Sequence, residues 1–200
     1  LEQRSLVERK ASLFSLQPVV MEYVTERLVE QICEDVIGGV TAINNTNNNW
    51  KNSLFRTHAL LKAQTKDYLR NTQIRLIIKP IVERLQIALT GKGNLETHLN
   101  QILETLRGKP ALAIGYAGGN IINLLCQQQI SLKGYDFSRV TIWQAYLQGV
   151  DLQDVNFAHS DLSKSVFTKT LGVVFGVAFS PDGKLLATGD VEGQLRLWQV

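Results

Sequence analysis

The side chains best suited to chemistry in this 200-residue sequence are three histidines and two cysteines. His58, His98 and His159 have no partner at metal-ligand spacing and no cysteine nearby. Cys33 lies on the apolar side of a predicted helix and Cys126 ends an apolar run, so both are expected to be small buried hydrophobic residues. The sequence therefore predicts no metal and no cofactor.

Nucleotide-binding and carboxylate chemistry are also poorly supported. None of the three Gly-Lys pairs, Gly91-Lys92, Gly108-Lys109 and Gly183-Lys184, has an upstream glycine at the spacing of a phosphate-binding loop. Asp151, Asp154 and Asp161 could suggest a carboxylate site. Asp151 and Asp161, however, adjoin residues that are expected to point into a repeat core, and a side chain in that position usually faces solvent. We therefore expect a protein that is not an enzyme.

The sequence offers one feature with a possible binding role, a concentration of positive charge. Residues 51–92 contain nine Lys or Arg and two acidic residues, a net charge of +7. Lys62, Lys66 and Arg70 recur every four residues and would share one face of a predicted helix over 53–79. This basic stripe is interpreted first as a solvated face, next as a surface for a protein partner or for intramolecular docking, and last as a nucleic-acid site.

The overall composition is that of a globular protein, with 44% apolar and 20% charged residues. The whole-chain net charge of +3 is too small to indicate a nucleic-acid partner by itself. No apolar run reaches the roughly 18 residues of a membrane span, and no signal-peptide core is present. Two cysteines without paired spacing suit a reducing compartment, so we expect a cytoplasmic protein without membrane contact and of undetermined oligomeric state.

The first part of the chain has a hairpin pattern followed by a helical pattern. Leu1 to Leu16 reads as two short strands, and Pro18 suits the first position of a helix. Gly38-Gly39 would end that helix. Its apolar residues recur at every fourth position, namely Val20, Val24, Leu28, Ile32 and Val36. A hairpin with such a helix, over residues 1–37, is similar to the C-terminal half of a winged-helix domain.

The middle of the chain is predicted to be a linker followed by a helical bundle. Residues 38–52 include an asparagine-rich run that favours turns, so they are interpreted as the linker. The helix over 53–79 should break or kink at Pro80. Shorter amphipathic helices are expected at 81–90, 95–107 and 120–129, which completes a bundle over 53–129.

A five-residue repeat begins at residue 130. Large apolar residues occupy every fifth position: Leu132, Phe137, Ile142, Leu147, Leu152, Phe157, Leu162 and Phe167. A period of five fits neither a helix nor a flat strand. It predicts a four-sided coil of 20 residues per turn, with these side chains inside and about two turns stacked by strand-type hydrogen bonds.

This repeat resembles the pentapeptide-repeat family, whose usual unit is Ala-Asp/Asn-Leu-x-x. The units Val150–Asp154, Val155–His159 and Ser160–Lys164 match it best. The resemblance implies a right-handed β-helix over residues 130–169.

The C-terminal part has strand-like runs at 173–179, 184–188 and 194–198, joined by tight-turn sequences. It resembles one WD repeat over residues 172–200, with Trp198 in the place of the tryptophan of the terminal dipeptide and Gln199 in place of the aspartate. A propeller needs typically 4–8 blades of four strands. We therefore expect a single three-stranded blade of an incomplete propeller, and a chain that is a fragment of a longer protein.

The order of these segments resembles the middle of bacterial STAND-type signalling ATPases, in which an NB-ARC nucleotide-binding module and a winged helix precede WD repeats. The expected fold class is an α+β mosaic: a helical region, a short pentapeptide-repeat β-helix and one WD-type blade. The resemblance implies a non-enzymatic segment that couples an upstream switch to a downstream sensor. A nucleic-acid-binding module using the basic helix over 53–79 is the alternative.

Overall fold

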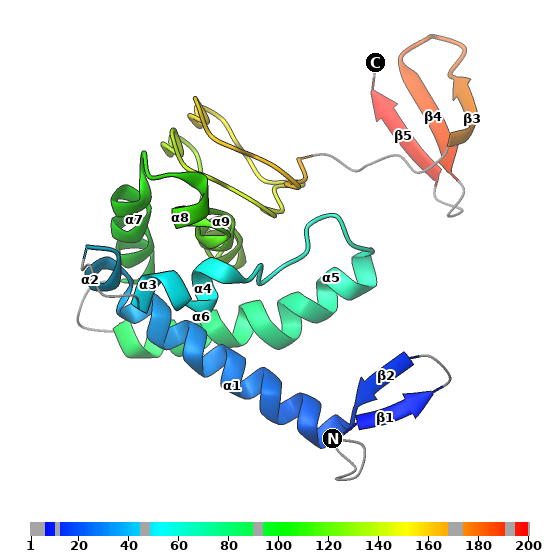
Figure 1. The fold of residues 1–200 in the computed structure, drawn as a ribbon. Coiled ribbons are helices and arrows are strands. Elements are labelled where there is room, and N and C mark those ends of the chain that lie inside the picture. Colours follow the sequence, from blue (N-terminus) through cyan, green and yellow to red (C-terminus); the bar gives the residue numbers. More distant parts are fainter. Residues whose placement is uncertain are drawn as a thin grey trace. The chain divides into compact units, whose positions relative to one another are not determined.

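The computed structural model describes residues 7–10, 13–44, 49–89, 94–167, 174–190 and 195–199. The chain divides into two compact units, Leu1–Phe167 and Thr168–Val200. The first contains every described helix and the four-sided coil, and the second contains a three-stranded sheet (Figure 1). The predicted boundaries at residues 37, 52 and 129 therefore fall inside one unit, because helices and coil share a single hydrophobic core.

The first unit opens with the expected hairpin and helix. Strands β1 (Val7–Lys10) and β2 (Leu13–Leu16) pair in antiparallel register. Helix α1 (Pro18–Ile37) begins at the predicted proline and ends where Gly38 donates its backbone N–H to the carbonyl of Glu34 at 3.0 Å. Its apolar stripe is buried only towards the C-terminus: Ile32 and Val36 are fully buried, whereas Val24 is 47% exposed.

The predicted linker over 38–52 is wrong in part, because the described residues of that segment are largely helical. Helices α2 (Gly39–Asn44) and α3 (Asn49–Asn52) lie within it, and α4 (Leu54–Thr57) follows. Trp50 is buried and donates its indole N–H to the carbonyl of Ala113 at 2.9 Å. One large aromatic side chain thus ties an asparagine-rich segment to the core.

The single helix predicted over 53–79 is also wrong. After α4 the chain is irregular until α5 (Asp67–Gln73), which continues through a π-helical segment η2 (Ile74–Ile78) into α6 (Lys79–Leu89). Pro80 does not end this helix, because it lies in the first turn of α6. The π-helical turn before it places the bond from the N–H of Lys79 on the carbonyl of Ile74, five residues back.

Two of the remaining helices lie close to their predicted ranges of 95–107 and 120–129, and a third, over 111–114, was not predicted. Helix α7 (Leu95–Leu106) is capped by Asn94, whose side chain accepts the N–H of Thr97 at 2.8 Å. Helices α8 (Ala111–Ile114) and α9 (Ala117–Gln127) follow. Fully buried side chains from several of these helices form the core, including Ile32, Phe55, Ile81, Leu85, Leu99, Ile102, Leu106, Ile121 and Ile122.

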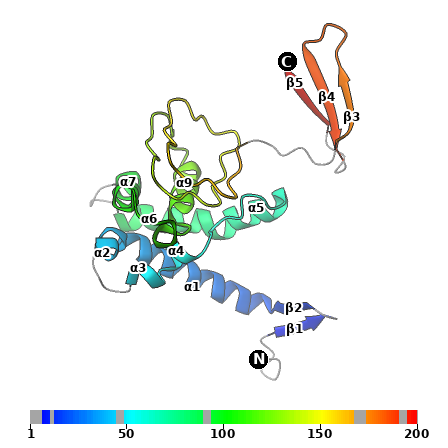
Figure 2. The ribbon, with the colours of Figure 1, turned by 45° about the horizontal axis from the view of Figure 1, so that its top comes forward.

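Residues 130–167 form the predicted four-sided coil of two turns. Parallel bridges join Asp136 to Asn156, Thr141 to Asp161 and Tyr146 to Val166, each pair being 20 residues apart. In Figure 2 the coil is seen as a ring beside α9. The inward residues of the first turn are at most 1% exposed, namely Leu132, Phe137, Ile142 and Leu147.

Burial decreases along the coil. Leu152, Phe157 and Leu162 in the second turn are half-buried against the core, and Phe167 is 37% exposed. The rings of Phe137 and Phe157 stack with centroids 5.6 Å apart. Stacked aromatic and aliphatic side chains therefore connect the two turns.

Every corner of the coil uses left-handed backbone. Gly134 and Gly149 have φ of +75° and +76°, and six residues with a Cβ adopt φ between +56° and +64° at the same five-residue spacing. These six are Gln129, Arg139, Gln144, Asp154, His159 and Lys164. Because this region costs an L-residue roughly 1–2 kcal/mol, the corners store strain that the stacked core offsets.

The second unit is a meander in the order β3 (Val174–Phe179), β4 (Leu185–Asp190) and β5 (Leu195–Gln199). Both pairings are antiparallel, with Val177 opposite Thr188 and Ala187 opposite Leu197. The three predicted strands are therefore confirmed to within one or two residues. The turn that contains Glu192 lies outside the described residues.

Replacing Gly149 by Ala should lower the free energy of unfolding of the first unit by about 1 kcal/mol, because φ is positive and no neighbouring atom lies within 4 Å of the added Cβ. His159→Gly should act in the opposite direction by up to about 1 kcal/mol. Urea denaturation measures both. Gly38→Ala is the control at ordinary φ, and equal effects of Gly149→Ala and Gly38→Ala would contradict the assignment of strain.

Candidate interaction site

The junction between helix α9 and the coil is the most constrained part of the first unit. At Gly118 an added Cβ would overlap the carbonyl oxygen of Thr141, and at Gly119 it would overlap that of Trp143. The helix backbone therefore lies directly against the coil backbone. Only glycine permits this approach.

Two buried asparagines on α9 complete the junction. Asn120 accepts the N–H of Leu60 at 3.0 Å and donates to the carbonyls of Phe55 and His58 at 2.8 and 2.9 Å. Asn123 donates to the carbonyl of Gln144 at 3.0 Å and accepts the N–H of Tyr146 at 2.9 Å. Each amide thus pairs with backbone groups of segments that are distant from it in the sequence.

The irregular segment between α4 and α5 is held between α9 and the coil. Gln144 at a coil corner accepts the N–H of Ala63 at 2.8 Å through its side-chain oxygen. The side chain of Gln73 accepts the N–H of Lys62 at 3.0 Å. These bonds explain why residues 58–66 leave the helical path that their spacing predicts.

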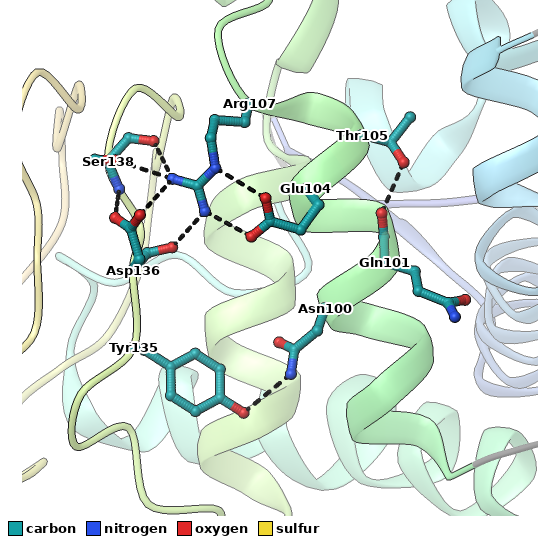
Figure 3. A network of polar contacts seen from close by, with 8 residues as sticks. All are labelled: Asn100, Gln101, Glu104, Thr105, Arg107, Tyr135, Asp136 and Ser138. Atoms are coloured by element: carbon teal, nitrogen blue, oxygen red, sulfur yellow. Dashed lines mark hydrogen bonds and ion pairs between the residues drawn. The ribbon is translucent and has the colours of Figure 1, made fainter.

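A polar cluster centred on Arg107 joins the end of α7 to the coil (Figure 3). Its guanidinium donates to both carboxylate oxygens of Glu104, at 3.1 and 2.7 Å. It also donates to the carbonyl and hydroxyl oxygens of Ser138, at 2.7 and 2.9 Å, and to the carbonyl of Asp136 at 2.8 Å. A planar five-donor group suits such a branched site.

The charges of this cluster change the titration of its members. A hydrogen bond from Arg107 lowers the pKa of Glu104 below its usual value of 4.5. The pKa of Asp136 is lowered from 3.8, first by the backbone N–H of Ser138 and to a smaller extent by Arg107. Both carboxylates are therefore stabilised in their charged form.

Tyr135 extends the same seam between α7 and the coil. Its hydroxyl donates to Glu96 at 2.7 Å and accepts a longer bond from Asn100 at 3.4 Å. Burial, and then the bond to Glu96, raises the pKa of Tyr135 to about 12. The phenol thus stays protonated at neutral pH and acts as a donor.

The basic stripe of the sequence is not a continuous surface. Lys62 and Lys66 are exposed and precede α5, whereas Arg70 is buried. The guanidinium of Arg70 lies 4.0 Å from the centroid of the Tyr146 ring, forms an ion pair with Asp67 and donates to the carbonyls of Ala63 and Thr65. The prediction that Lys62, Lys66 and Arg70 share one exposed helix face is therefore wrong, because Arg70 is buried against Tyr146 of the coil. Binding of a partner by Lys62 and Lys66 stays a prediction.

The thiols lie in environments that suppress their reactivity. Burial raises the pKa of both Cys33 and Cys126 to about 11, so both remain protonated at neutral pH. The thiol of Cys33 lies 3.9 Å from the carbonyl of Ile81 as a weak donor.

The histidines serve local structure. His98 contacts the carbonyl of Val36 at 2.8 Å through Nε2, His58 pairs with the hydroxyl of Thr57 at 2.9 Å, and His159 forms a coil corner. Within the described ranges, no group of three or more His, Cys, Asp or Glu side chains could hold a metal ion.

Asp151 and Asp161 cap turns of the coil, whereas Asp154 lies at one of its left-handed corners. Asp151 and Asp161 each accept the N–H two residues further on, from Gln153 and Ser163 respectively, at 3.0 Å. Asp161 also accepts the indole N–H of Trp143 at 2.6 Å. Hydrogen bonds from the side chain of Ser163 and from Trp143 lower the pKa of Asp161. These bonds give the Asp position of the repeat a structural role as an Asx turn.

A hollow of about 710 Å³ lies between the end of α1 and helices α2 and α3. Its lining includes the carboxylates of Glu34 and Asp35, and Asp35 accepts bonds from Ser53 and Phe55 at 2.9 and 3.2 Å. Asp35 therefore accepts the otherwise unpaired donors at the start of α4.

Sequence reasoning gave no hydrogen-bonding or close-packing role to the residues that make the helix–coil junction. Arg107, Asn120, Asn123 and the two adjacent glycines carry it. The available signal was the placement of two glycines and two amides in an otherwise apolar helix, which costs helix stability unless tertiary contacts require them.

Comparison with known proteins supports the repeat assignments. The family model of the pentapeptide repeats matches residues 133–171 in eight copies. These residues are pentapeptide repeats. The coil geometry therefore agrees with the family match over all its described residues.

Two proteins of Nostoc sp. (strain PCC 7120 / SAG 25.82 / UTEX 2576) are similar to the chain. The uncharacterized WD repeat-containing protein alr2800 is 46% identical over 222 aligned residues, which cover 100% of this chain and 18% of that protein. The uncharacterized WD repeat-containing protein alr3466 is 45% identical over 102 residues, 50% of this chain and 7% of that protein. The chain thus spans less than a fifth of the length of alr2800. No solved structure matches it.

Among the described helices, none combines the length and apolar character required to cross a membrane.

Removing the Arg107 guanidinium should make the free energy of unfolding depend less on pH in the acid range. The folded-state pKa values of Glu104 and Asp136 lie below their usual values of 4.5 and 3.8. The two ionised carboxylates therefore stabilise the fold above these usual values, and this stabilisation is lost as the pH falls through the folded-state values. In Arg107→Ala the fall in unfolding free energy from about pH 6 to about pH 3 should be smaller than in the wild type.

Chemical denaturation across this pH range measures the effect. Arg27→Ala, which removes an exposed pair with Glu30 on α1, is the control and should leave the pH dependence unchanged. Parallel pH profiles for the wild type and Arg107→Ala would contradict the assigned role.

Proposed function

We propose that this chain is a non-enzymatic protein-interaction segment in which a rigid helix–coil unit connects to the first blade of a WD-repeat propeller. The observation that carries the proposal is the composition of the three-stranded sheet. Its two faces both expose large apolar side chains, and such surfaces normally mark contact with other protein elements.

One face of the sheet carries apolar residues of β3. Val177 and Phe179 are 60% and 64% exposed and lie opposite Thr188 and Leu186 of β4, so they share one face. Phe175 is 79% exposed and lies at the register irregularity between Val174 and Gly176.

The other face carries residues of β5. Leu197 lies opposite Ala187, and Ala187 lies opposite Ala178, so this row points away from Val177. Leu195 and Leu197 are 86% and 73% exposed. A sheet that is apolar on both faces fits between two further layers, as each propeller blade fits between its neighbours.

Two further findings support the interaction role. Both similar Nostoc proteins have names that describe them as WD repeat-containing, and alr2800 extends well beyond the length of this chain. In the first unit the buried polar groups of the junction are used in structural hydrogen bonds, which suits a mechanical connection better than catalysis.

The proposal includes coupling of an upstream nucleotide switch to the propeller, as the resemblance to STAND-type ATPases implies. A connection transmits motion only if its parts move as one body, and the direct backbone contact of Gly118 and Gly119 with the coil supplies that stiffness. If alr2800 does not bind ATP or ADP, the switch is removed from the proposal and the interaction role remains.

Hydrogen exchange tests the blade assignment. Amides matching β3, β4 and β5 should exchange about tenfold or more slowly in alr2800 than in this chain, because neighbouring blades would cover both faces. Amides matching α9 should exchange at similar rates in both proteins and serve as the internal control. Equal rates for the sheet in the two proteins would contradict the proposal.

The purified chain should self-associate through the uncovered sheet as its concentration rises. Val177→Asp and Leu197→Asp, one on each face, should each reduce the average mass measured by sedimentation velocity, because a charge opposes apolar contact. Leu112→Asp is the matched control, at a leucine of α8 that is 82% exposed. Equal loss of mass in all three variants would contradict a specific role for the sheet.

A further inference from the structure

The N-terminal half of α1 exposes an apolar and acidic surface. Val19 and Tyr23, one helical turn apart on the same face of α1, are 75% and 64% exposed, because the core contacts of α1 begin nearer its C-terminus. Glu22 lies between them in the sequence. These residues are called the α1 patch.

A second apolar surface lies on the continuous helix formed by α5, η2 and α6. Tyr68, Leu69 and Leu76 are 65%, 44% and 46% exposed, while the core side of this helix is buried through Ile78, Ile81, Val82 and Leu85. Arg75 and Lys79 are exposed on the same helix. Tyr68, Leu69, Leu76 and these two cations are called the α5 patch.

The two patches have opposite charge. Residues 18–30 contain three glutamates and one arginine, but Glu26 and Glu30 pair with Arg84, and Glu30 also pairs with Arg27. In the α5 patch Lys79 pairs with Glu83, and nearby Arg70 is buried and pairs with Asp67. The charges left for docking are those of Glu22 and Arg75. Among the described residues neither Glu22 nor Arg75 has a hydrogen bond or an ion pair, so both charges are available to a partner.

We infer that the α1 patch of one molecule docks on the α5 patch of a second copy of this chain, so that the first unit forms a twofold dimer. Each molecule carries one patch of each kind, and a twofold axis therefore forms the contact twice. Both patches lie on helices whose other ends are fixed in one core, with α1 contacting η2 and α6. Little order has to be created on binding.

Charge explains why the patches should pair with each other and not with themselves. Two α1 patches would bring two copies of Glu22 together, and two α5 patches would bring two copies of Arg75 together, which is unfavourable at an interface. The mixed contact places apolar side chains against apolar side chains and Glu22 near the cations. This surface belongs to the first unit and is independent of the sheet on which the proposed function rests.

The test uses the full chain with Val177→Asp and Leu197→Asp, so that association through the sheet is removed. Sedimentation equilibrium should then show a dimer. Leu76→Asp should weaken the dimer about tenfold or more, since it places a carboxylate in the apolar contact. Circular dichroism verifies that each variant is folded, and Leu112→Asp is the control at an exposed leucine outside both patches.

Charge reversal makes the test specific for the two patches. Glu22→Lys alone and Arg75→Glu alone should each weaken the dimer, because both contacts of each variant's dimer then join like charges. An equimolar mixture of the two variants should restore the dimer. In the mixed dimer one contact joins the two substituted side chains and the other joins the native Glu22 and Arg75, so both contacts join opposite charges. Lys133→Glu, at an exposed position of the coil, should change nothing.

Three results would overturn the inference: a monomer in the sheet-disrupted chain, a dimer that Leu76→Asp leaves intact, or a mixture of charge variants no tighter than its components. A monomer would leave the proposed function standing. Failure of the blade assignment would equally leave this dimer standing.

Discussion

The first unit depends on one close approach, the contact between the backbone of α9 and that of the coil. Gly118 and Gly119 have no side chain to separate the two, and a single methyl group at either position would overlap a carbonyl oxygen of the coil. Protein interiors tolerate little excess volume. This contact therefore fixes the distance between the helical core and the first turn of the coil.

The other features of the junction follow from that distance. With α9 so close, Asn120 and Asn123 reach the irregular segment after α4 and the corner at Gln144, and Arg107 reaches Ser138 from the end of α7. The first turn of the coil is then buried, while the inward residues of the second turn are half-buried and the Phe157 ring stacks on that of Phe137 in the first. Strain at the coil corners is maintained because the stack holds both turns together.

The surfaces left outside this core carry the functional interpretation. The sheet of the second unit exposes apolar residues on both faces, and the helices of the first unit expose two apolar patches of opposite charge. In both units the exposed apolar side chains lie on regular elements, which present a fixed surface to a partner. The chain is similar to WD repeat-containing proteins and contains pentapeptide repeats, two features that suit a segment acting by contact.

The sequence alone determined the elements whose pattern is local and periodic. The five-residue spacing predicted the coil and its inward residues, the turn sequences predicted β3 to β5, and Pro18 with Gly38 marked the ends of α1. Tertiary structure decided the rest. A pattern of charges with four-residue spacing could not show that Arg70 is buried beneath Tyr146, nor could an asparagine-rich run show that Trp50 anchors it. Local spacing records which faces are apolar, but the partner of a buried polar group depends on segments that meet only after folding.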